Sequence, residues 1–293
     1  MDGINVDSLK ERIGLALEED IGLGDITAES VVEYNPHAQA QIIARQDGVI
    51  CGLDIAKMVF SHNGPPLDIQ IFAEDGDLVE SGQQLMTIAG SGLTILSAER
   101  TALNLLGRLS GIATLTAAYV RAIDGTNARI LDTRKTTPLW RDIEKYAVKC
   151  GGGVNHRMGL HDMVLIKENH IRWAGGLEKA VSHCIGEIGE DRQAIKIEVE
   201  VGSLDELEKV LEFSVDRILL DNMSPVTVSQ AVDMVRHKIP LEVSGGITLE
   251  TIREFAETGV EYISVGALTH SPEVFDVSLL FEDELKAPGK SVH

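Results

Sequence analysis

The segment Pro240-Leu-Glu-Val-Ser244-Gly-Gly246, followed about twenty residues later by Glu261-Tyr-Ile-Ser-Val265-Gly-Ala267, decides the fold. Both stretches are short β-branched runs that end in glycine, and a helical stretch, Leu249–Thr258, separates them. Such a strand–helix–strand repeat predicts parallel strands with right-handed crossovers. The terminal glycines either let backbone N–H groups approach the oxygens of a phosphate or only allow tight turns.

The same alternation extends over the whole C-terminal half of the chain. The predicted strands are Ala128–Asp132, Met163–Lys167, Ile195–Val201, Arg217–Asp221, Pro240–Ser244 and Glu261–Val265. The helices expected between most of them are Gly175–Gly186, Leu204–Glu212, Pro225–His237 and Leu249–Thr258. No GxGxxG pattern follows the first strand, so a closed or nearly closed α/β barrel fits better than an open doubly wound sheet.

The N-terminal half has a different organisation. Residues 8–19 predict an amphipathic helix that begins with the capping-box spacing of Ser8 and Glu11. A small α+β sandwich follows, and its predicted elements are strands at Ala38–Ala44, Val49–Leu53, Leu67–Ala73 and Gln84–Ala89 and a helix at Asp54–Ser61. Residues 92–122 predict one or two buried helices. We therefore expect a sandwich domain over residues 1–112, with the tail 276–293 packing back on it, and a barrel domain over residues 113–275.

Composition excludes several classes of function. The net charge of −20 argues against general binding to nucleic acids or anionic membranes. No stretch approaches 18 uninterrupted apolar residues, so no membrane span is expected, and the N-terminus lacks the features of a signal peptide. Three widely spaced cysteines without a CxxC pair argue against a disulfide scaffold or a zinc knuckle. We expect a cytoplasmic protein.

Basic residues gather in one stretch despite the acidic background. Residues 134–172 hold eight Lys/Arg and four Asp/Glu, a net charge of 8 − 4 = +4. Arg141, Lys145 and Lys149 share the spacing of a solvated helix face. The other basic side chains, at strand ends or beside a glycine-rich loop, are Arg134, Lys135, His156, Arg157 and Lys167. Because arginine pairs with carboxylates and lysine with phosphate, this group predicts a ligand with several carboxylates, phosphates or both.

Two carboxylates, Glu200 and Asp221, end neighbouring predicted strands within this basic surrounding. They would bind a cation such as a Mg²⁺ that bridges phosphate oxygens, or ribose hydroxyls, or would only pair with a neighbouring lysine. Glu198 points to the same strand face as Glu200 and ranks second as a ligand.

The order of these motifs closely resembles that of the quinolinate phosphoribosyltransferase family, the carboxylating nicotinate-nucleotide pyrophosphorylases. The matching motifs are Gly24-Asp-Ile-Thr27, Glu99-Arg-Thr-Ala-Leu-Asn104, Asp132-Thr-Arg-Lys-Thr-Thr-Pro138, Glu144-Lys-Tyr-Ala-Val148, Gly151-Gly-Gly-Val-Asn-His-Arg157, Asp162-Met-Val-Leu-Ile-Lys-Glu-Asn-His170, Glu198-Val-Glu-Val201, Leu219-Leu-Asp-Asn222, Ser244-Gly-Gly246 and Val265-Gly-Ala-Leu-Thr-His270. The resemblance implies an incomplete TIM-like α/β barrel with an N-terminal α+β sandwich domain. It also implies a pentosyltransferase of NAD synthesis that converts quinolinate and phosphoribosyl pyrophosphate to nicotinate mononucleotide, pyrophosphate and CO₂.

The resemblance further implies Mg²⁺ as cofactor and a homodimer or higher oligomer in which Arg100 reaches the partner's active site. With Arg100, the residues that would hold the pyridine dicarboxylate are Arg134, His156, Arg157 and Lys167. Lys135 would serve phosphoribosyl pyrophosphate, while Glu200 and Asp221 would hold Mg²⁺ and ribose hydroxyls. The residues expected to bind the 5′-phosphate are Ser244, Gly245, Gly246, Gly266 and His270, and further expected substrate contacts are Thr133, Val265 and Ala267. The residues expected to be catalytic are Lys135, Lys167, Glu200 and Asp221.

Two other interpretations stay open. A related phosphoribosyl- or ribosyltransferase acting on a different heterocycle would share the fold but lack the cations for the second carboxylate. The stretch Glu74–Leu85 is similar to the turn pattern of a biotinyl or lipoyl carrier domain, but residues 88–94 offer no lysine for attachment.

Overall fold

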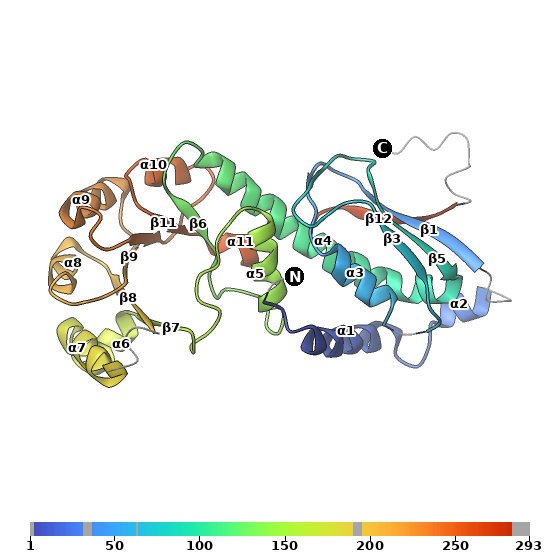
Figure 1. Ribbon diagram of the computed structural model, residues 1–293, viewed down its shortest axis with the longest axis horizontal. Coiled ribbons are helices and arrows are strands. Elements are labelled where there is room, and N and C mark those ends of the chain that lie inside the picture. The colour runs from blue at the N-terminus through green and yellow to red at the C-terminus, as the bar shows by residue number, and fades with distance from the viewer. Residues whose placement is uncertain (1–2, 32–36, 63, 190–194, 283–293) are drawn as a thin grey trace. The chain divides into compact units, whose positions relative to one another are not determined.

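The computed structural model describes residues 3–31, 37–62, 64–189 and 195–282, which form two compact units (Figure 1). The first unit holds the described residues up to Leu115, Pro138–Gly152 and those from Pro272 onward. The second holds Thr116–Thr137 and the described residues of Gly153–Ser271. The chain first passes from one unit to the other within a single long helix, α4 (Gly92–Ala122). No helix of the described chain has the length and apolar character that crossing a bilayer requires.

The first unit is built on an antiparallel sheet in the order β12-β1-β5-β3. Its strands are β1 (His37–Ala44), β3 (Asp68–Ile71), β5 (Gln84–Ser91) and β12 (Val277–Phe281), and a separate pair joins β2 (Gly48–Val49) to β4 (Leu78–Val79). The helices of this unit are α1 (Val6–Ile21), α2 (Ile26–Val31), α3 (Leu53–Phe60), the first part of α4, and α5 (Arg141–Cys150). Strand β12, far along the chain from β1, adds an edge to the sheet, because Ala44 pairs with Val277 and Ala40 with Phe281.

Local hydrogen bonds move two elements of this unit from their predicted bounds. Helix α1 begins at Val6 rather than Ser8, since the Asn5 side chain accepts the Ser8 N–H at 3.1 Å and acts as the N-cap. The strand predicted at Val49–Leu53 ends at Val49, and Leu53 begins α3 instead. Asp75 explains the change, because its Oδ1 accepts the N–H groups of Gly52 and Leu53 at 2.9 and 3.0 Å.

Helix α5 corrects the expectation of a solvated lysine face. Lys145 is 0% exposed, whereas Lys149 of the same helix is exposed. The helix is buried over most of its circumference, and Glu144, beside Lys145, accepts two hydrogen bonds from Arg108. Regular i, i+4 spacing therefore did not indicate exposure here.

The second unit contains six parallel strands in the order β6-β11-β10-β9-β8-β7. They are β6 (Arg129–Leu131), β7 (Met163–Ile166), β8 (Lys196–Val201), β9 (Arg217–Asp221), β10 (Leu241–Ser244) and β11 (Tyr262–Ser264). This is the cyclic order of a barrel, but no ladder between β6 and β7 occurs in the described residues. Val154 instead pairs with the edge of β6 that β11 does not occupy, where the Val154 N–H donates to Ile130 O at 2.8 Å. The predicted incomplete α/β barrel is confirmed.

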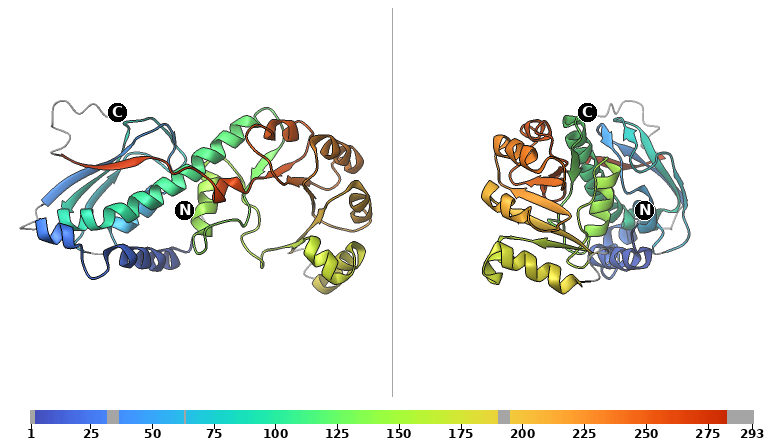
Figure 2. Two further views of the ribbon diagram at one scale, coloured as in Figure 1. Left: turned by 180° about the vertical axis from the view of Figure 1, so that it is seen from behind. Right: turned by 60° about the vertical axis from the view of Figure 1, so that its left-hand side comes forward.

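Alternation along the strands gives the barrel two different faces. Ile197, Val199, Ile218 and Val243 are 0% exposed and belong to the face that the helices cover. The helices of this unit are α6 (Glu168–Ala174), α7 (Leu177–Ile188), α8 (Leu204–Val210), α9 (Pro225–Val235), α10 (Ile252–Ala256), α11 (Ala267–His270) and the last part of α4. Helices α7 to α10, yellow to red in Figures 1 and 2, all lie on the outer side of the strands. Side chains of the other face, such as Glu242, point into the barrel interior.

A close approach in the first unit gives a test of the packing. In α4, a Cβ added to Gly111 would overlap the carbonyl oxygen of Glu273, just before β12. We expect Gly111→Ala to destabilise the protein by about 1–3 kcal/mol, since the backbone must shift. The matched control is Gly186→Ala in α7, which meets no atom within 4 Å and is expected to stabilise by roughly 0.5–1 kcal/mol. Thermal unfolding checks both, and a Gly111→Ala midpoint at or above that of the unaltered chain would contradict the packing.

Candidate active site

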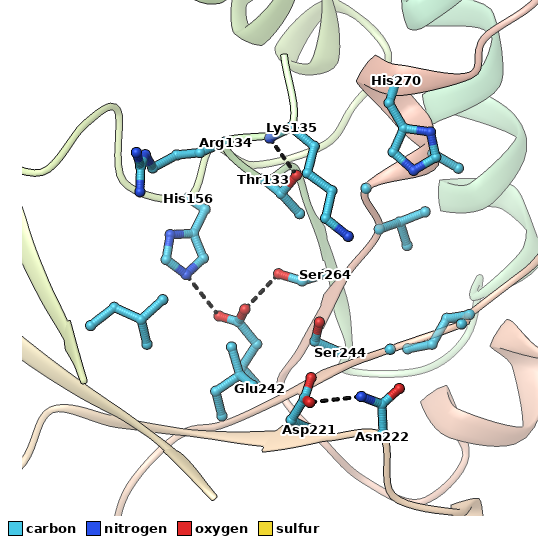
Figure 3. Close-up of a pocket in the computed structure, with 18 of the residues that line it drawn as sticks. Thr133, Arg134, Lys135, His156, Asp221, Asn222, Glu242, Ser244, Ser264 and His270 are labelled. Carbon is cyan, nitrogen blue, oxygen red and sulfur yellow. Dashed lines mark hydrogen bonds and ion pairs between the residues drawn. The ribbon is translucent and has the colours of Figure 1, made fainter. Parts of the chain in front are cut away.

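A cavity of about 710 Å³ opens at the carboxyl ends of the barrel strands (Figure 3). Every residue that lines it belongs to the second unit, so its geometry depends on that unit alone. α/β barrels carry their chemistry at this end of the strands. The predicted site residues that line the cavity are Thr133, Arg134, Lys135, His156, Arg157, Lys167, Asp221, Ser244, Gly245, Gly246, Val265, Gly266, Ala267 and His270.

Two predicted site residues lie outside this lining. Glu200 makes an ion pair with Lys167, with Lys167 Nζ and Glu200 Oε2 2.9 Å apart, and its other oxygen accepts the Glu168 N–H at 3.3 Å. It therefore reaches the cavity through Lys167. Arg100 is exposed on α4 in the first unit. Its predicted role in a partner's site stays a prediction.

Four cationic side chains line the cavity, two from the segment after β6 and two from the segments around β7. Burial, and next the charge of Arg134, lower the pKa of the Arg157 guanidinium. One Arg157 nitrogen is held by the carbonyl oxygen of Met163 at 3.0 Å. Such a concentration of cations suits a multiply anionic ligand.

Two hydrogen bonds to the backbone of Lys135 fix this residue at the cavity. Its N–H donates to the hydroxyl of Thr133 at 3.0 Å, and its carbonyl oxygen accepts the Thr269 hydroxyl at 2.8 Å. The aliphatic stem of Lys135 passes Gly266, where an added Cβ would lie 3.1 Å from Lys135 Cδ. Glycine at 266 therefore leaves the room that the lysine side chain occupies.

The turn after β10 has a backbone that requires glycine. Gly245 and Gly246 have φ angles of 108° and 61°, which residues with a Cβ rarely adopt. A Cβ at Gly245 would also overlap Oδ1 of Asn222, which itself has a φ of 54°. Consecutive glycines at the end of a barrel strand leave backbone N–H groups accessible, which is how barrels bind phosphate.

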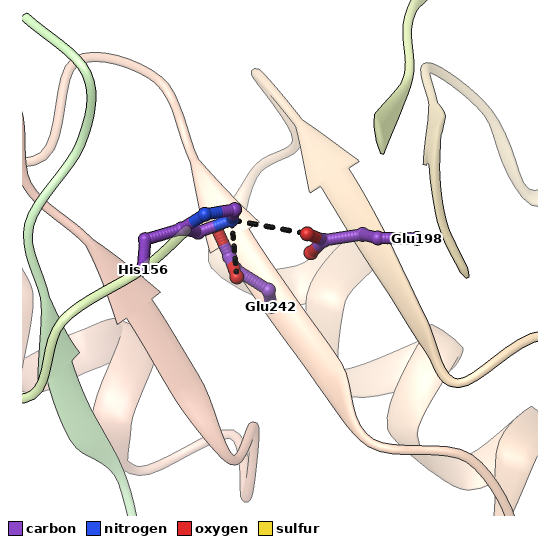
Figure 4. Close-up of side chains that lie close together, drawn as sticks. All are labelled: His156, Glu198 and Glu242. Carbon is purple, nitrogen blue, oxygen red and sulfur yellow. Dashed lines mark ion pairs between the residues drawn. The ribbon is translucent and has the colours of Figure 1, made fainter. Parts of the chain in front are cut away.

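His156 lies between the cavity and the barrel interior, with both ring nitrogens engaged. Nδ1 accepts the N–H of Arg157 at 2.7 Å, while Nε2 lies 3.0 Å from Glu198 Oε2 and 3.5 Å from Glu242 Oε2 (Figure 4). The backbone N–H of His156 donates to Asp132 Oδ1 at 2.9 Å. Asp132, at the end of β6, therefore anchors the loop that carries this ring.

Glu198 and Glu242 are both 0% exposed. Burial, and next the charge of Glu198, raise the pKa of the Glu242 carboxyl to about 7, although His156, Ser264 and Arg217 act in the opposite direction. Burial also raises the pKa of Glu198, and neither of its oxygens makes a hydrogen bond of good geometry within the described residues. Glu242, which itself lines the cavity, and Glu198 thus lie close to its cationic side chains.

Sequence reasoning missed several of the lining residues. They are Leu165, Leu219, Asn222, Glu242, Ile247, Thr248 and Ser264. Period-two alternation could have identified Glu242, because it precedes Ser244 by two residues and so shares its strand face. The aliphatic residues on either side of Glu242 concealed this signal.

Comparisons with known proteins agree with this architecture. Family models described as the N-terminal and C-terminal domains of quinolinate phosphoribosyl transferase match residues 25–110 and 112–280. A quinolinate phosphoribosyltransferase [decarboxylating] from Nicotiana glauca is 41% identical over 293 aligned positions, covering 94% of this chain and 83% of the relative. A probable nicotinate-nucleotide pyrophosphorylase [carboxylating] from Bacillus subtilis is 40% identical, covering 92% of each chain.

A solved structure shows the same arrangement of the chain. The nicotinate-nucleotide pyrophosphorylase from Francisella tularensis superposes with a TM-score of 0.90 at 40% identity, over 96% of this chain and 98% of the other. Both halves of the fold are thus found together in known relatives. The chain belongs to the quinolinate phosphoribosyltransferase family.

Proposed function

We propose that the cavity is the active site of a phosphoribosyltransferase that converts quinolinate and phosphoribosyl pyrophosphate to nicotinate mononucleotide, pyrophosphate and CO₂ in NAD synthesis. The proposal rests on one observation: a cluster of cations and a glycine turn suited to phosphate lie in the same cavity. One part of the lining is cationic, with Arg134, Arg157 and Lys167, and another is the glycine turn at Gly245 and Gly246. This pairing suits a ligand set with carboxylates at one end and a phosphate at the other.

The cationic part would hold the two carboxylates of quinolinate. Arg134 and Arg157 offer forked donors that match a carboxylate, and Lys167 offers a point charge that Glu200 orients at 2.9 Å. Arg100 would add a further cation from a partner subunit. We therefore propose a homodimer as the smallest active form and the cytoplasm as its location, where the three thiols would stay reduced.

The opposite part would hold phosphoribosyl pyrophosphate. Ser244, the glycine turn and the segment Val265–His270 would bind the 5′-phosphate, and Lys135 would contact the pyrophosphate. Glu200 and Asp221 come from neighbouring parallel strands and present only hard oxygen donors, which fits Mg²⁺ held by carboxylates and substrate phosphates. When bound, Mg²⁺ would supply electrostatic stabilisation of the charge on the departing pyrophosphate.

The reaction needs positioning more than a reactive side chain. The bond from the anomeric carbon to pyrophosphate breaks, and the pyridine nitrogen forms the new bond to that carbon. The ring nitrogen then carries a positive charge, which favours loss of the adjacent carboxylate as CO₂ and its replacement by a proton. Lys135 and Lys167 would stabilise negative charge at opposite ends, and the held geometry lowers the entropic barrier.

The alternative is a related transferase that acts on a different heterocycle. Such an enzyme would share the barrel and the phosphate turn, so the fold alone does not separate the two. The arginine and lysine cluster favours quinolinate, because a ligand with one carboxylate would leave part of it unpaired.

A substrate comparison tests this choice. With phosphoribosyl pyrophosphate and Mg²⁺, we expect purified protein to form nicotinate mononucleotide and CO₂ from quinolinate. Nicotinic acid should react at least about 100-fold more slowly, because the site's cations for the second carboxylate would stay unpaired. Chromatography of the nucleotide product and release of labelled CO₂ measure both reactions. Product from nicotinic acid alone would establish the alternative.

Removal of the predicted cations tests their roles. We expect Lys135→Ala, Lys167→Ala and Arg100→Ala each to lower kcat/KM by about 100-fold or more, the usual scale for a lost electrostatic contact in an active site. The matched control is Lys209→Ala, an exposed lysine of α8 away from the cavity. Steady-state kinetics with thermal unfolding as a folding check would decide, and near-normal turnover in all three would contradict the assignment.

Mixing two inactive variants tests the contribution of Arg100 from a partner. In a mixed dimer of Arg100→Ala and Lys167→Ala chains, one of the two sites would combine an intact Lys167 with the partner's intact Arg100. After random exchange of subunits, we expect about a quarter of normal activity to return, as two-fold symmetry requires. No recovery despite proven exchange would mean that Arg100 acts within its own chain or not at all.

A further inference from the structure

Glu242 is fully buried on β10, and no part of the proposed chemistry uses it. Its carboxylate joins three elements. Oε1 accepts the Ser264 hydroxyl of β11 at 2.5 Å, and Oε2 lies 3.5 Å from His156 Nε2 (Figure 3). Oε2 also lies 2.8 Å from an Arg217 guanidinium nitrogen of β9. Arg217 is held in turn over the ring of Tyr262, 4.2 Å from its centroid. Groups on both neighbouring strands thus fix the position of the Glu242 carboxylate relative to the histidine.

The contacts of His156 determine which nitrogen carries the ring proton. Nδ1 accepts the Arg157 N–H at 2.7 Å, so its lone pair is in use and the proton is on Nε2. Nε2 lies within ion-pair distance of both buried carboxylates, 3.0 Å from Glu198 Oε2 and 3.5 Å from Glu242 Oε2 (Figure 4). The ring is therefore held at both ends, by Arg157 on one side and by the buried acids on the other.

This tautomer argues against a metal ion among the three side chains. The ligand atoms of His156, Glu198 and Glu242 lie within 4.8 Å of one another, as in a candidate cation site. A cation would need the lone pair of Nε2, which the proton occupies, and Glu242 already has a cationic partner in Arg217. Both oxygens of Glu242 are thus taken by Arg217 and Ser264, and the proton on Nε2 leaves His156 no lone pair on the side of the two acids.

The orientation of the His156 ring affects the cavity through Arg157. The N–H that His156 accepts belongs to Arg157, whose guanidinium lines the cavity and is anchored to Met163 O at 3.0 Å. A rotated His156 ring would release that N–H and change the position of the Arg157 backbone. A histidine donor left without its buried acceptor would also lose an interaction that favours this orientation.

We infer that Glu242 is a positioning residue for the pyridine end of the cavity, which holds His156 in the Nε2–H tautomer so that Arg157 is aligned for the dicarboxylate. The inference rests on the proposed function, because it assigns that end of the cavity to quinolinate. Glu242 does not contact the substrate on this view. It acts through His156 and Arg157 alone, so its removal should affect one substrate and spare the other.

The test is Glu242→Gln, which keeps the shape of the side chain but removes the negative charge that faces Arg217 and His156. We expect KM for quinolinate to rise about tenfold, the scale of one lost hydrogen bond to a charged group. KM for phosphoribosyl pyrophosphate and kcat should stay within about twofold, and the thermal midpoint should show that the chain is folded. The matched control is Glu261→Gln, because Glu261 also faces a histidine, His237 at 2.8 Å, but lies outside the cavity lining.

A double-mutant cycle separates positioning from a structural role. In a His156→Ala background, Glu242→Gln should change KM for quinolinate by less than about twofold, because the residue through which it acts is gone. An undiminished effect in that background, or equal rises in both KM values, would overturn the inference. If the unaltered protein turns over quinolinate but His156→Ala leaves its KM unchanged, the inference fails and the proposed function stands. No turnover of quinolinate by the unaltered protein would refute the proposed function itself.

A measurement on the unaltered chain avoids dependence on folding of the variants. Nitrogen-15 shifts of the imidazole rings, with His156 assigned by its absence in His156→Ala, report the tautomer directly. We expect a protonated Nε2 and an unprotonated Nδ1. A protonated Nδ1 with an unprotonated Nε2 would remove the basis of the inference.

Discussion

The barrel interior depends on a balance between two buried carboxylates and the cations around them. A buried charge without partners is costly, so Glu198 and Glu242 can be retained only because basic side chains lie beside them. The cations depend on the acids in turn. Arg157 is partly desolvated and repelled by Arg134, and the charge of Glu198 offsets part of that cost. Without this polar layer, a cavity lined by so many cations would be expensive to keep open for a ligand.

The open edge of the barrel and the position of the site have a common cause. The chain between β6 and β7 does not return through a covering helix within the second unit, because α5 belongs to the first. Val154 instead satisfies the outer edge of β6, and two residues later the chain brings His156 to the cavity. Asp132, which ends β6 and accepts the His156 N–H, secures this return. An unclosed ladder thus places a loop where a closed barrel would have had a strand neighbour.

The sequence predicted the barrel strands and most of the cavity because both depend on local patterns. Short β-branched runs gave the strands to within two residues, and glycines at strand ends marked the turn at Gly245. Local patterns could not predict contacts between residues that lie far apart in the sequence. The Asp75 contact that shortens β2 comes from over twenty residues away, and the burial of Lys145 depends on what covers α5. Glu242 was missed for a third reason, since one acid within an aliphatic strand does not reveal what lies opposite.

The arrangement also explains how a site without a nucleophile could be selective. On the proposed assignment, specificity comes from charges in a partly desolvated cavity rather than from shape. A ligand that lacks one carboxylate leaves a cation of the site unpaired, which costs far more than a missing methyl group in an apolar pocket. The discrimination between a ligand with two carboxylates and a ligand with one depends on accurate placement of the arginines. A displaced guanidinium would pair poorly with both ligands. The buried acids that fix His156 and Arg157 are therefore as much a part of selectivity as the cations that touch the substrate.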